Sequence, residues 1–218
     1  MYTGFAISLA WPQTWCKQSG SWYDSTMKLF GFNKNNFYKV GHAAVILIEA
    51  STCKCLYFDF GRYHAPYGYG RVRDSETDHD LLINSRAVLH DDDFRLANFE
   101  EILIELANNE ACHGIGELHA SYTNINFEKA YQFVKQMQNN SPWKYGPFIL
   151  NGTNCSRFVR TVVLSGNPPI TDRLKIYFPL TLSPTPVGNV KSLKNKVVIK
   201  NRQASNNQDI FSCNVIPT

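Results

Sequence analysis

The sequence is poor in charged residues and lacks any repeat or low-complexity tract. Of its 218 residues, 18% are charged and 44% are hydrophobic, and the formal net charge is only +4. A chain of this composition can bury enough apolar surface to fold, which excludes an intrinsically disordered protein. Its length suits one globular domain, with room for an appendage.

Basic clusters and nucleotide-binding patterns are scarce as well. Lysine and arginine are scattered, apart from the final segment, and the chain has no phosphate-loop, RNP-like or helix-turn-helix pattern. We therefore expect no nucleic-acid partner. An RNA-binding domain that uses the basic tail and exposed aromatic residues ranks last among the functions considered.

No stretch has the length of a signal peptide or of a membrane span. The apolar run from Phe5 to Ala10 is too short for either, and no basic segment precedes it. We therefore expect a cytoplasmic protein without a transmembrane segment.

Cysteines are sparse for a chain of this length. The six are Cys16, Cys53, Cys55, Cys112, Cys155 and Cys213. An even number suggests a disulfide framework only in short secreted proteins, and no Cys and His pairs stand at zinc-finger spacing. The sequence predicts no metal and no cofactor.

The apolar patterns predict one mixed domain of strands and helices. Strands are expected at Gly4–Ala10, Val40–Glu49, Leu56–Gly61, Leu81–Leu89, Glu117–Thr123 and Leu174–Leu182, and helices at Asn98–Asn108, Phe127–Gln138 and from Cys155 to Gly166. Residues 1–183 form a single domain in this interpretation. Residues 184–218, rich in Ser, Asn, Pro and Lys, are a C-terminal extension or a small hairpin packed on it.

Cys155 is expected in the first turn of a buried helix. Thr153 or Asn154 can cap this helix, and Gly166 stands where a left-handed C-cap would. The helix dipole and unpaired amides favour a thiolate at that position and would stabilise an oxyanion beside it. On this stretch alone, an inert buried cysteine is the more common explanation.

Two polar residues interrupt neighbouring apolar strands. Alternation places His42 on the same face as Ala44, and Asp59 on the same face as Tyr57. Buried polar groups need partners, and the simplest partners here are each other. His42, Asp59 and Cys155 are therefore candidates for a nucleophile, its base and an orienting group.

Two motifs carry a resemblance to a known superfamily. Asn154-Cys155-Ser156-Arg157-Phe158-Val159 and Gly41-His42-Ala43-Ala44-Val45 resemble the circularly permuted branch of the NlpC/P60 papain-like superfamily. That branch includes lecithin:retinol acyltransferase-like proteins and YiiX-like peptidases. The resemblance covers roughly Val40 to Gly166. It implies an α+β papain-like fold in which a small antiparallel sheet packs against the cysteine helix and one or two further helices.

The resemblance implies a thiol hydrolase (peptidase or amidase) or an acyltransferase. Cys155 matches the nucleophile and His42 the general base, and Asp59 or His64 would supply the third polar residue. Ser156 and Arg157 replace a Glu-His pair that is usual in the acyltransferase-like members, which favours the YiiX-like side.

The surroundings of the site are predicted from position. Tyr145 and Gln13 are candidate oxyanion donors, whereas Trp11 and Arg62 are candidate substrate contacts. Arg71 and Arg73 share the Gly, Tyr and Arg-rich segment with Arg62 and could hold a substrate carboxylate or phosphate.

The substrate is expected to be a peptide, amide or ester, with murein fragments and lipids as candidates. The alternative function is a catalytically silent papain-like binding module for a peptide or glycan. The oligomeric state stays open.

Overall fold

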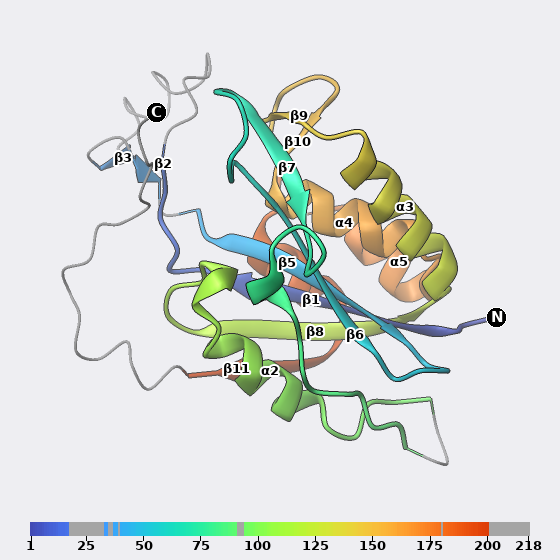
Figure 1. Cartoon of the computed structure of the whole chain (residues 1–218). Coiled ribbons are helices and arrows are strands. Elements are labelled where there is room, and N and C mark those ends of the chain that lie inside the picture. Colours follow the sequence, from blue (N-terminus) through green and yellow to red (C-terminus); the bar gives the residue numbers. More distant parts are fainter. Residues whose placement is uncertain (18–32, 35–36, 39, 91–93, 180, 201–218) are drawn as a thin grey trace.

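A strongly curved, eight-stranded sheet runs through the centre of the molecule (Figure 1). The computed structural model describes residues 1–17, 33–34, 37–38, 40–90, 94–179 and 181–200. The strand order is β10-β9-β7-β6-β5-β1-β8-β11, and every neighbouring pair is antiparallel except β9 and β10. The strands are β1 (Gly4–Trp11), β5 (His42–Glu49), β6 (Cys55–Gly61), β7 (Tyr69–Arg73), β8 (Leu118–Ile125), β9 (Trp143–Tyr145), β10 (Gly152–Thr153) and β11 (Lys194–Ile199).

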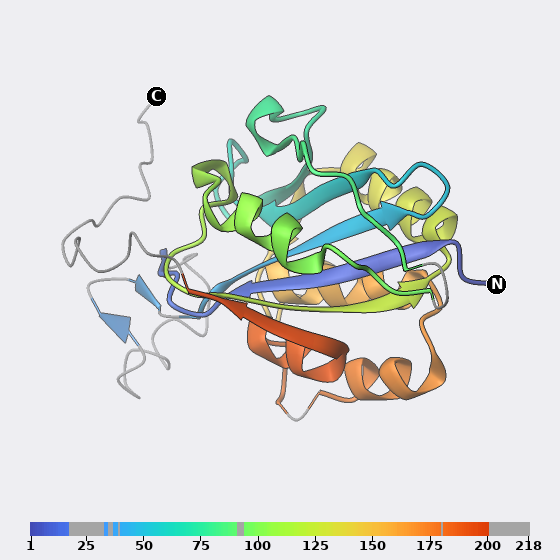
Figure 2. The same ribbon diagram turned by 90° about the horizontal axis from the view of Figure 1, so that it is seen from below.

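Helices cover both faces of this sheet (Figure 2). One face carries α2 (Phe99–Ala107) and the short 3-10 helices η1 (His79–Leu81) and η2 (Glu110–Cys112). The other carries α3 (Phe127–Asn139), α4 (Cys155–Ser165), α5 (Ile170–Tyr177) and α6 (Pro186–Ser192). A separate three-stranded sheet has β4 (Phe37–Tyr38) between β2 (Cys16–Lys17) and β3 (Asn33–Lys34). No helix in these described ranges is long and apolar enough to cross a membrane.

The central strands have apolar side chains on both faces because both faces are covered. In β5, Ala44 and Ile46 pack into the core under α2, whereas Val45 and Leu47 pack into the core under α3 and α4. Tyr57 of β6 lies in the same core as Ala44, so the predicted shared faces are confirmed. Such two-sided burial explains why these strands read as continuous hydrophobic runs.

The mixed α and β class is confirmed, but the predicted small sheet is wrong in size. The sheet has eight strands, and five α-helices rather than two or three lie in the described residues. The strands predicted around β1, β5, β6 and β8 are present, as are α2, α3 and α4. Asn126 caps α3, since its side chain accepts a hydrogen bond of 3.0 Å from the Lys129 amide.

The strand predicted at Leu81–Leu89 does not form. The amides of Asn84 and Ser85 donate to the Glu105 carboxylate of α2, at 2.7 and 2.9 Å, instead of to a neighbouring strand. The Asn98 side chain is used in the same way: it accepts from the Val88 amide and makes no cap hydrogen bond at the start of α2. Side chains of α2 and its cap therefore take several of these amides, and only isolated bridges, Lys54–Arg86 and Leu89–Leu96, remain of the predicted strand.

The strand predicted at Leu174–Leu182 is also wrong, because the segment begins in α5. Pro169 is the N-cap residue of that helix, and the Arg160 guanidinium donates to the carbonyls of Ile176 and Tyr177 at its end.

The predicted left-handed cap after α4 lies one residue later than expected. Gly166 has a φ of −76°, and Asn167 has a φ of 49°.

The segment 184–200, assigned from sequence to an extension or hairpin, contributes α6 and β11. The Thr185 hydroxyl caps α6 by accepting from the Gly188 amide at 3.0 Å. β11 then pairs with β8 as an edge strand of the main sheet. Residues 18–32, 35–36, 39 and 201–218 lie outside the described residues.

Packing on the strand that begins at His42 can be tested with a matched pair of leucines. Leu47 is fully buried against the α4 side, whereas Leu150 is 86% exposed. We expect Leu47→Ala to lower the free energy of unfolding by about 2–5 kcal/mol, and Leu150→Ala to change it by about 0.5 kcal/mol or less. Urea unfolding measures both values, and equal losses would contradict this assignment of the core.

Candidate active site

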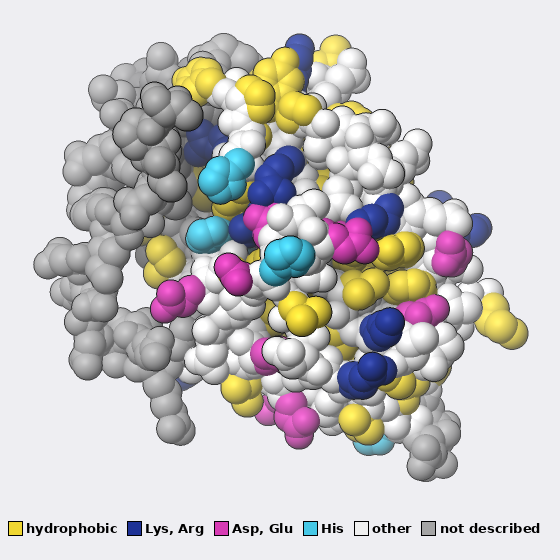
Figure 3. Space-filling view, in the orientation of Figure 1, with side chains coloured by type: hydrophobic (Ala, Val, Ile, Leu, Met, Phe, Trp, Pro, Cys, Tyr) yellow, Lys and Arg dark blue, Asp and Glu magenta, His cyan; other side chains and the backbone are white. Residues whose placement is uncertain are grey.

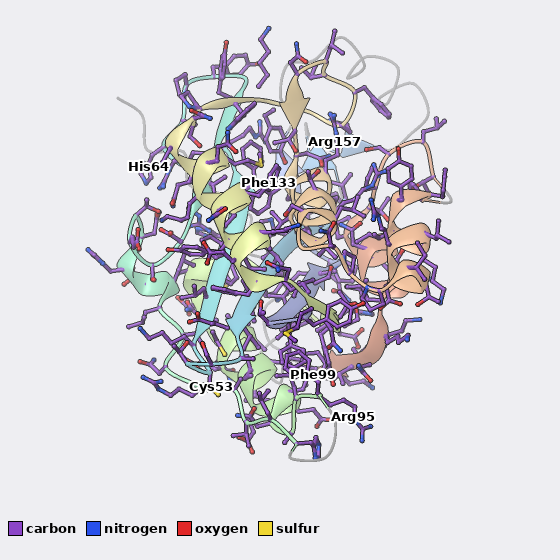
Figure 4. The ribbon with its side chains drawn as sticks, turned by 90° about the vertical axis from the view of Figure 1, so that its right-hand side faces the viewer. Cys53, His64, Arg95, Phe99, Phe133 and Arg157 are labelled. Carbon is purple, nitrogen blue, oxygen red and sulfur yellow. The ribbon has the colours of Figure 1, made fainter. Side chains whose placement is uncertain are left out.

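Cys155, His42 and Asp59 come together at one end of the sheet. In Figure 4, His64 and Arg157 lie toward this end, and Cys53 of the β5–β6 turn lies at the other. Arg157 belongs to the first turn of α4, and His64 follows β6, so the labels mark where the cysteine helix starts and where β6 ends.

Gly41 sets the start of the strand that carries His42. Its φ is +76°, and a Cβ atom there would lie 3.0 Å from the Trp11 carbonyl oxygen and 3.1 Å from the Pro12 Cα. The Gly41 amide also donates to the Thr14 carbonyl at 3.1 Å. Glycine is the residue that adopts this positive φ and also leaves room for the Trp11 and Pro12 backbone. These two constraints fix the residue at which β5 begins.

The Cys155 thiol stands at the start of α4 and is 6% exposed. Asn154 caps the helix through a 2.9 Å hydrogen bond from the Arg157 amide to its side-chain oxygen, as predicted. Burial by itself would raise the pKa of the thiol, but contact with His42, the Ala43 amide and the Ser156 hydroxyl lowers that pKa below its usual value. The site therefore favours a thiolate.

The His42 ring lies between this thiol and Asp59. Its Nε2 is 3.4 Å from Asp59 Oδ2, which leaves Nδ1 as the nitrogen available to the thiol. Burial favours the neutral ring, yet Asp59 and Cys155 together raise the pKa of His42 to about 9. Trp11 is stacked on the ring at a centroid distance of 5.9 Å, and Tyr63 meets it edge-on at 6.5 Å.

Asp59 is fully buried and is held by an arginine. Arg73 donates from Nε to Oδ1 at 3.0 Å and from Nη2 to Oδ2 at 2.6 Å, while the Tyr57 hydroxyl donates to Oδ2 at 3.1 Å. Burial would raise the pKa of this carboxyl, but His42 and Arg73 lower it to about 2. The carboxylate therefore stays ionised and faces His42 in one orientation.

Arg73 is itself held from three sides. Besides Asp59, its Nη2 donates to the Ala111 carbonyl at 3.1 Å, and its guanidinium lies 3.5 Å from the centroid of the Tyr63 ring. Only 4% of the side chain is exposed. The predicted contact between Arg73 and a substrate is therefore wrong, because the guanidinium is already used inside the protein.

The pairing of β6 with β7 is the reason that sequence reasoning missed this role. Asp59 and Arg73 are directly opposite in that register. The sequence of β7, Tyr69–Arg73, is rich in Gly and Arg, and this composition gives no strand signal. One signal was available: three neighbouring strands each contain a buried polar residue, namely His42, Asp59 and Arg73.

The other predicted site residues lie at different places around this centre. Trp11 is buried against His42, as described above. Tyr145 stacks on Phe60 at 5.9 Å, and the Arg62 guanidinium lies 5.2 Å from the Tyr145 ring. Gln13 directs a buried Oε1 toward the loop at Gly116.

His64 and Arg71 lie outside the triad. His64 is exposed, so Asp59 rather than His64 is beside His42. Arg71 forms a paired hydrogen bond with the Asp78 carboxylate, at 2.8 Å for each nitrogen. In the part of the chain that is described, no group of three His, Cys, Asp or Glu side chains could hold a metal ion.

Comparisons with known proteins point to one family. The family model described as type VI secretion system effector TseH-like matches residues 6–169, a range that includes His42, Asp59 and Cys155. The crystal structure of the type VI secretion system effector TseH superposes with a TM-score of 0.54 and 18% sequence identity, covering 88% of each chain. At that identity, the superposition shows a shared fold. No curated protein matched the sequence.

The buried ion pair can be tested against a more exposed pair in the same strand. We expect Arg73→Gln to lower the free energy of unfolding by about 3–5 kcal/mol, because it leaves the Asp59 carboxylate buried and unpaired. Arg71→Gln, whose ion-pair partners are each 21% exposed, should cost about 1 kcal/mol or less.

The pH dependence of this difference follows from Asp59. Its pKa is lowered in the folded state from 3.8 to about 2, so its contribution to stability is present above pH 3.8 and is lost as the pH falls through about 2. The gap between the two variants should therefore narrow in strong acid. Similar losses of unfolding free energy for Arg71→Gln and Arg73→Gln at neutral pH would contradict this prediction. They would show that the buried Arg73–Asp59 pair stabilises the protein no more than the exposed Arg71–Asp78 pair.

Proposed function

This chain belongs to the TseH-like family of type VI secretion system effectors, and we propose that it acts as a cysteine hydrolase of the papain-like NlpC/P60 type. The observation that carries the proposal is the contact of the Cys155 thiol, at a helix start, with a His42 ring that is itself paired with buried Asp59. These are the parts that nucleophilic acyl transfer requires.

The first half of the reaction forms a thioester. The Cys155 thiolate attacks the carbonyl carbon of an amide, and the oxygen takes up the negative charge beside the backbone amides at the start of α4. As the tetrahedral species collapses, the C–N bond breaks and His42 gives its proton to the leaving amine. Tyr145 and Gln13 stay predictions for a second oxyanion donor.

The second half releases the acid. His42, now neutral, takes a proton from water while the water oxygen attacks the thioester carbonyl. The C–S bond then breaks, the carboxylic acid leaves, and Cys155 returns as a thiolate beside protonated His42. Asp59 stabilises the imidazolium in both halves, and Arg73 acts only by positioning Asp59.

We propose amide hydrolysis, with peptides and murein fragments as the substrate class, rather than lipid acyl transfer. At the positions where acyltransferase-like members have Glu and His, the Ser156 hydroxyl lies 3.9 Å from the Cys155 sulfur, and the Arg157 guanidinium donates to the carbonyls of residues 146, 147 and 149. Neither side chain reproduces the Glu-His pair. A protonated His42 supports an amine leaving group, which amide cleavage needs.

Family membership also bears on where the protein acts. The expectation of a cytoplasmic protein came from the missing signal-peptide pattern, which does not address export by a dedicated secretion machine. Membership of an effector family supports secretion, so we propose that the hydrolase acts after delivery to another compartment or cell.

The reactivity of Cys155 tests this function directly. The pKa of a free thiol is about 8.5. We expect iodoacetamide to label Cys155 at a rate that persists well below this pH, and we expect that rate to fall in His42→Ala. The measurement is the labelling rate of each cysteine peptide against pH, by mass spectrometry. Partly buried Cys53, at the other end of the sheet in Figure 4, is the internal control and should be indifferent to His42→Ala.

An inert Cys155 would overturn the hydrolase. Cys155 and His42 are each only 6% exposed, so labelling requires the reagent to reach a sulfur that is almost fully buried. A thiol that reacts only after denaturation would favour the alternative, a silent binding module with the same fold.

Turnover is the second test. Cys155→Ser should reduce release of amino groups from purified murein peptides by about 10³-fold or more, because a neutral hydroxyl replaces the thiolate. Asp59→Asn should also lower the rate, since the imidazolium loses its carboxylate partner. A wild-type rate in Cys155→Ser would exclude the nucleophile, whatever substrate was cleaved.

A further inference from the structure

Charge is divided unevenly along the chain. Residues 1–128 contain 10 basic and 16 acidic residues, whereas residues 129–218 contain 12 basic and 2 acidic residues. The modest overall charge of +4 therefore hides an acidic first part and a strongly basic second part. Such asymmetry indicates attraction to an anionic surface.

The fold gathers part of this basic second half on a face of its own, although Lys135 of α3 pairs with Asp74 and Glu76 of the first part. The face with η1, α2 and η2 contains many of the acidic residues, several of which are visible in Figure 3. The opposite face is built from α4, α5 and α6 (Figure 2). Between residues 129 and 200 the single acidic residue is Asp172, which is 1% exposed and accepts a 2.8 Å hydrogen bond from Thr123. Exposed Arg173, Lys175 and Lys191 on α5 and α6 therefore have no acidic neighbour within that range.

An apolar stripe lies among these cations. Along α5 and just beyond it, Ile170 is 65% exposed, Leu174 52%, Tyr177 52% and Phe178 66%. The spacing of four, three and one residues places them on one side of the helix, while Ile176 on the other side is buried. We call these four residues the α5 stripe. A contiguous exposed apolar patch of this kind indicates a binding surface.

The α5 stripe is fixed to the helix that carries the thiol. Arg160 of α4 donates to the carbonyls of Ile176 and Tyr177, at 3.0 and 2.6 Å, and its guanidinium lies 5.3 Å from the Tyr177 ring. Arg160 follows Cys155 by five residues, which is about 7.5 Å along the axis of an α-helix. The end of the stripe is therefore close to the catalytic end of α4.

We propose that the α5 stripe and the cations beside it dock on a lipid bilayer with anionic headgroups. Ile170 and Leu174 would enter the acyl boundary, and Tyr177 and Phe178 would lie at the interface. Arg173, Lys175 and Lys191 would remain at the headgroups, where their charge is complementary. This inference goes beyond the proposed hydrolase and does not depend on its chemistry.

Vesicle sedimentation of the full chain tests this docking. We expect binding to phosphatidylcholine vesicles that contain phosphatidylglycerol, weaker binding to phosphatidylcholine alone, and weakening of the former by salt. Leu174→Ser combined with Phe178→Ser should reduce the partition coefficient by about tenfold or more. The matched control is Ile104→Ser, which removes a 49% exposed apolar residue from α2 on the acidic face and should leave binding unchanged.

Three results would overturn the proposal. The first is no binding to anionic vesicles at low salt. The second is equal binding of the stripe variant and the wild type. The third is a wild-type protein that is a dimer by light scattering and a stripe variant that is a monomer, with no vesicle binding by either protein. That result would make the α5 stripe an interface between copies of the chain. Circular dichroism checks folding, and an unchanged Cys155 labelling rate in the stripe variant keeps this test separate from that of the hydrolase.

Discussion

The Asp59–Arg73 pair is the interaction on which this end of the molecule depends. A carboxylate with no exposed surface is stable only if it is paired and hydrogen-bonded. Arg73 supplies the pairing from β7 and Tyr57 an additional hydrogen bond from β6, which leaves the remaining side of Oδ2 to His42 on β5. Three neighbouring strands are therefore held in register by one carboxylate. The same carboxylate keeps His42 protonated next to the thiol.

The catalytic candidates could be predicted from the sequence because each follows from a local rule. Asn154 and the apolar spacing after it place Cys155 at a helix start, and strand alternation makes His42 and Asp59 buried polar neighbours. Arg73 could not be assigned in this way, because its partner depends on which strand pairs with β6. A short strand that contains glycine and arginine has little β-propensity of its own.

The two wrong strands have the same physical origin. Leu81–Leu89 and Leu174–Leu182 both have β-prone residues, yet side chains from other elements satisfy their backbone groups. The Glu105 carboxylate binds the amides of the first, and the Arg160 guanidinium binds the carbonyls of the second. Tertiary contacts of this kind override local propensity and cannot be read from a single sequence.

The protonation state of His42 is the most direct test of this account. An NMR titration of the His42 ring, assigned by comparison with His42→Ala, should show a proton that is retained at neutral pH and lost near pH 9. The same titration in Asp59→Asn should move to lower pH, because burial then dominates. A wild-type ring that titrates at or below its ordinary pKa of 6.5 would contradict the thiolate–imidazolium pair and the role given to Asp59 and Arg73.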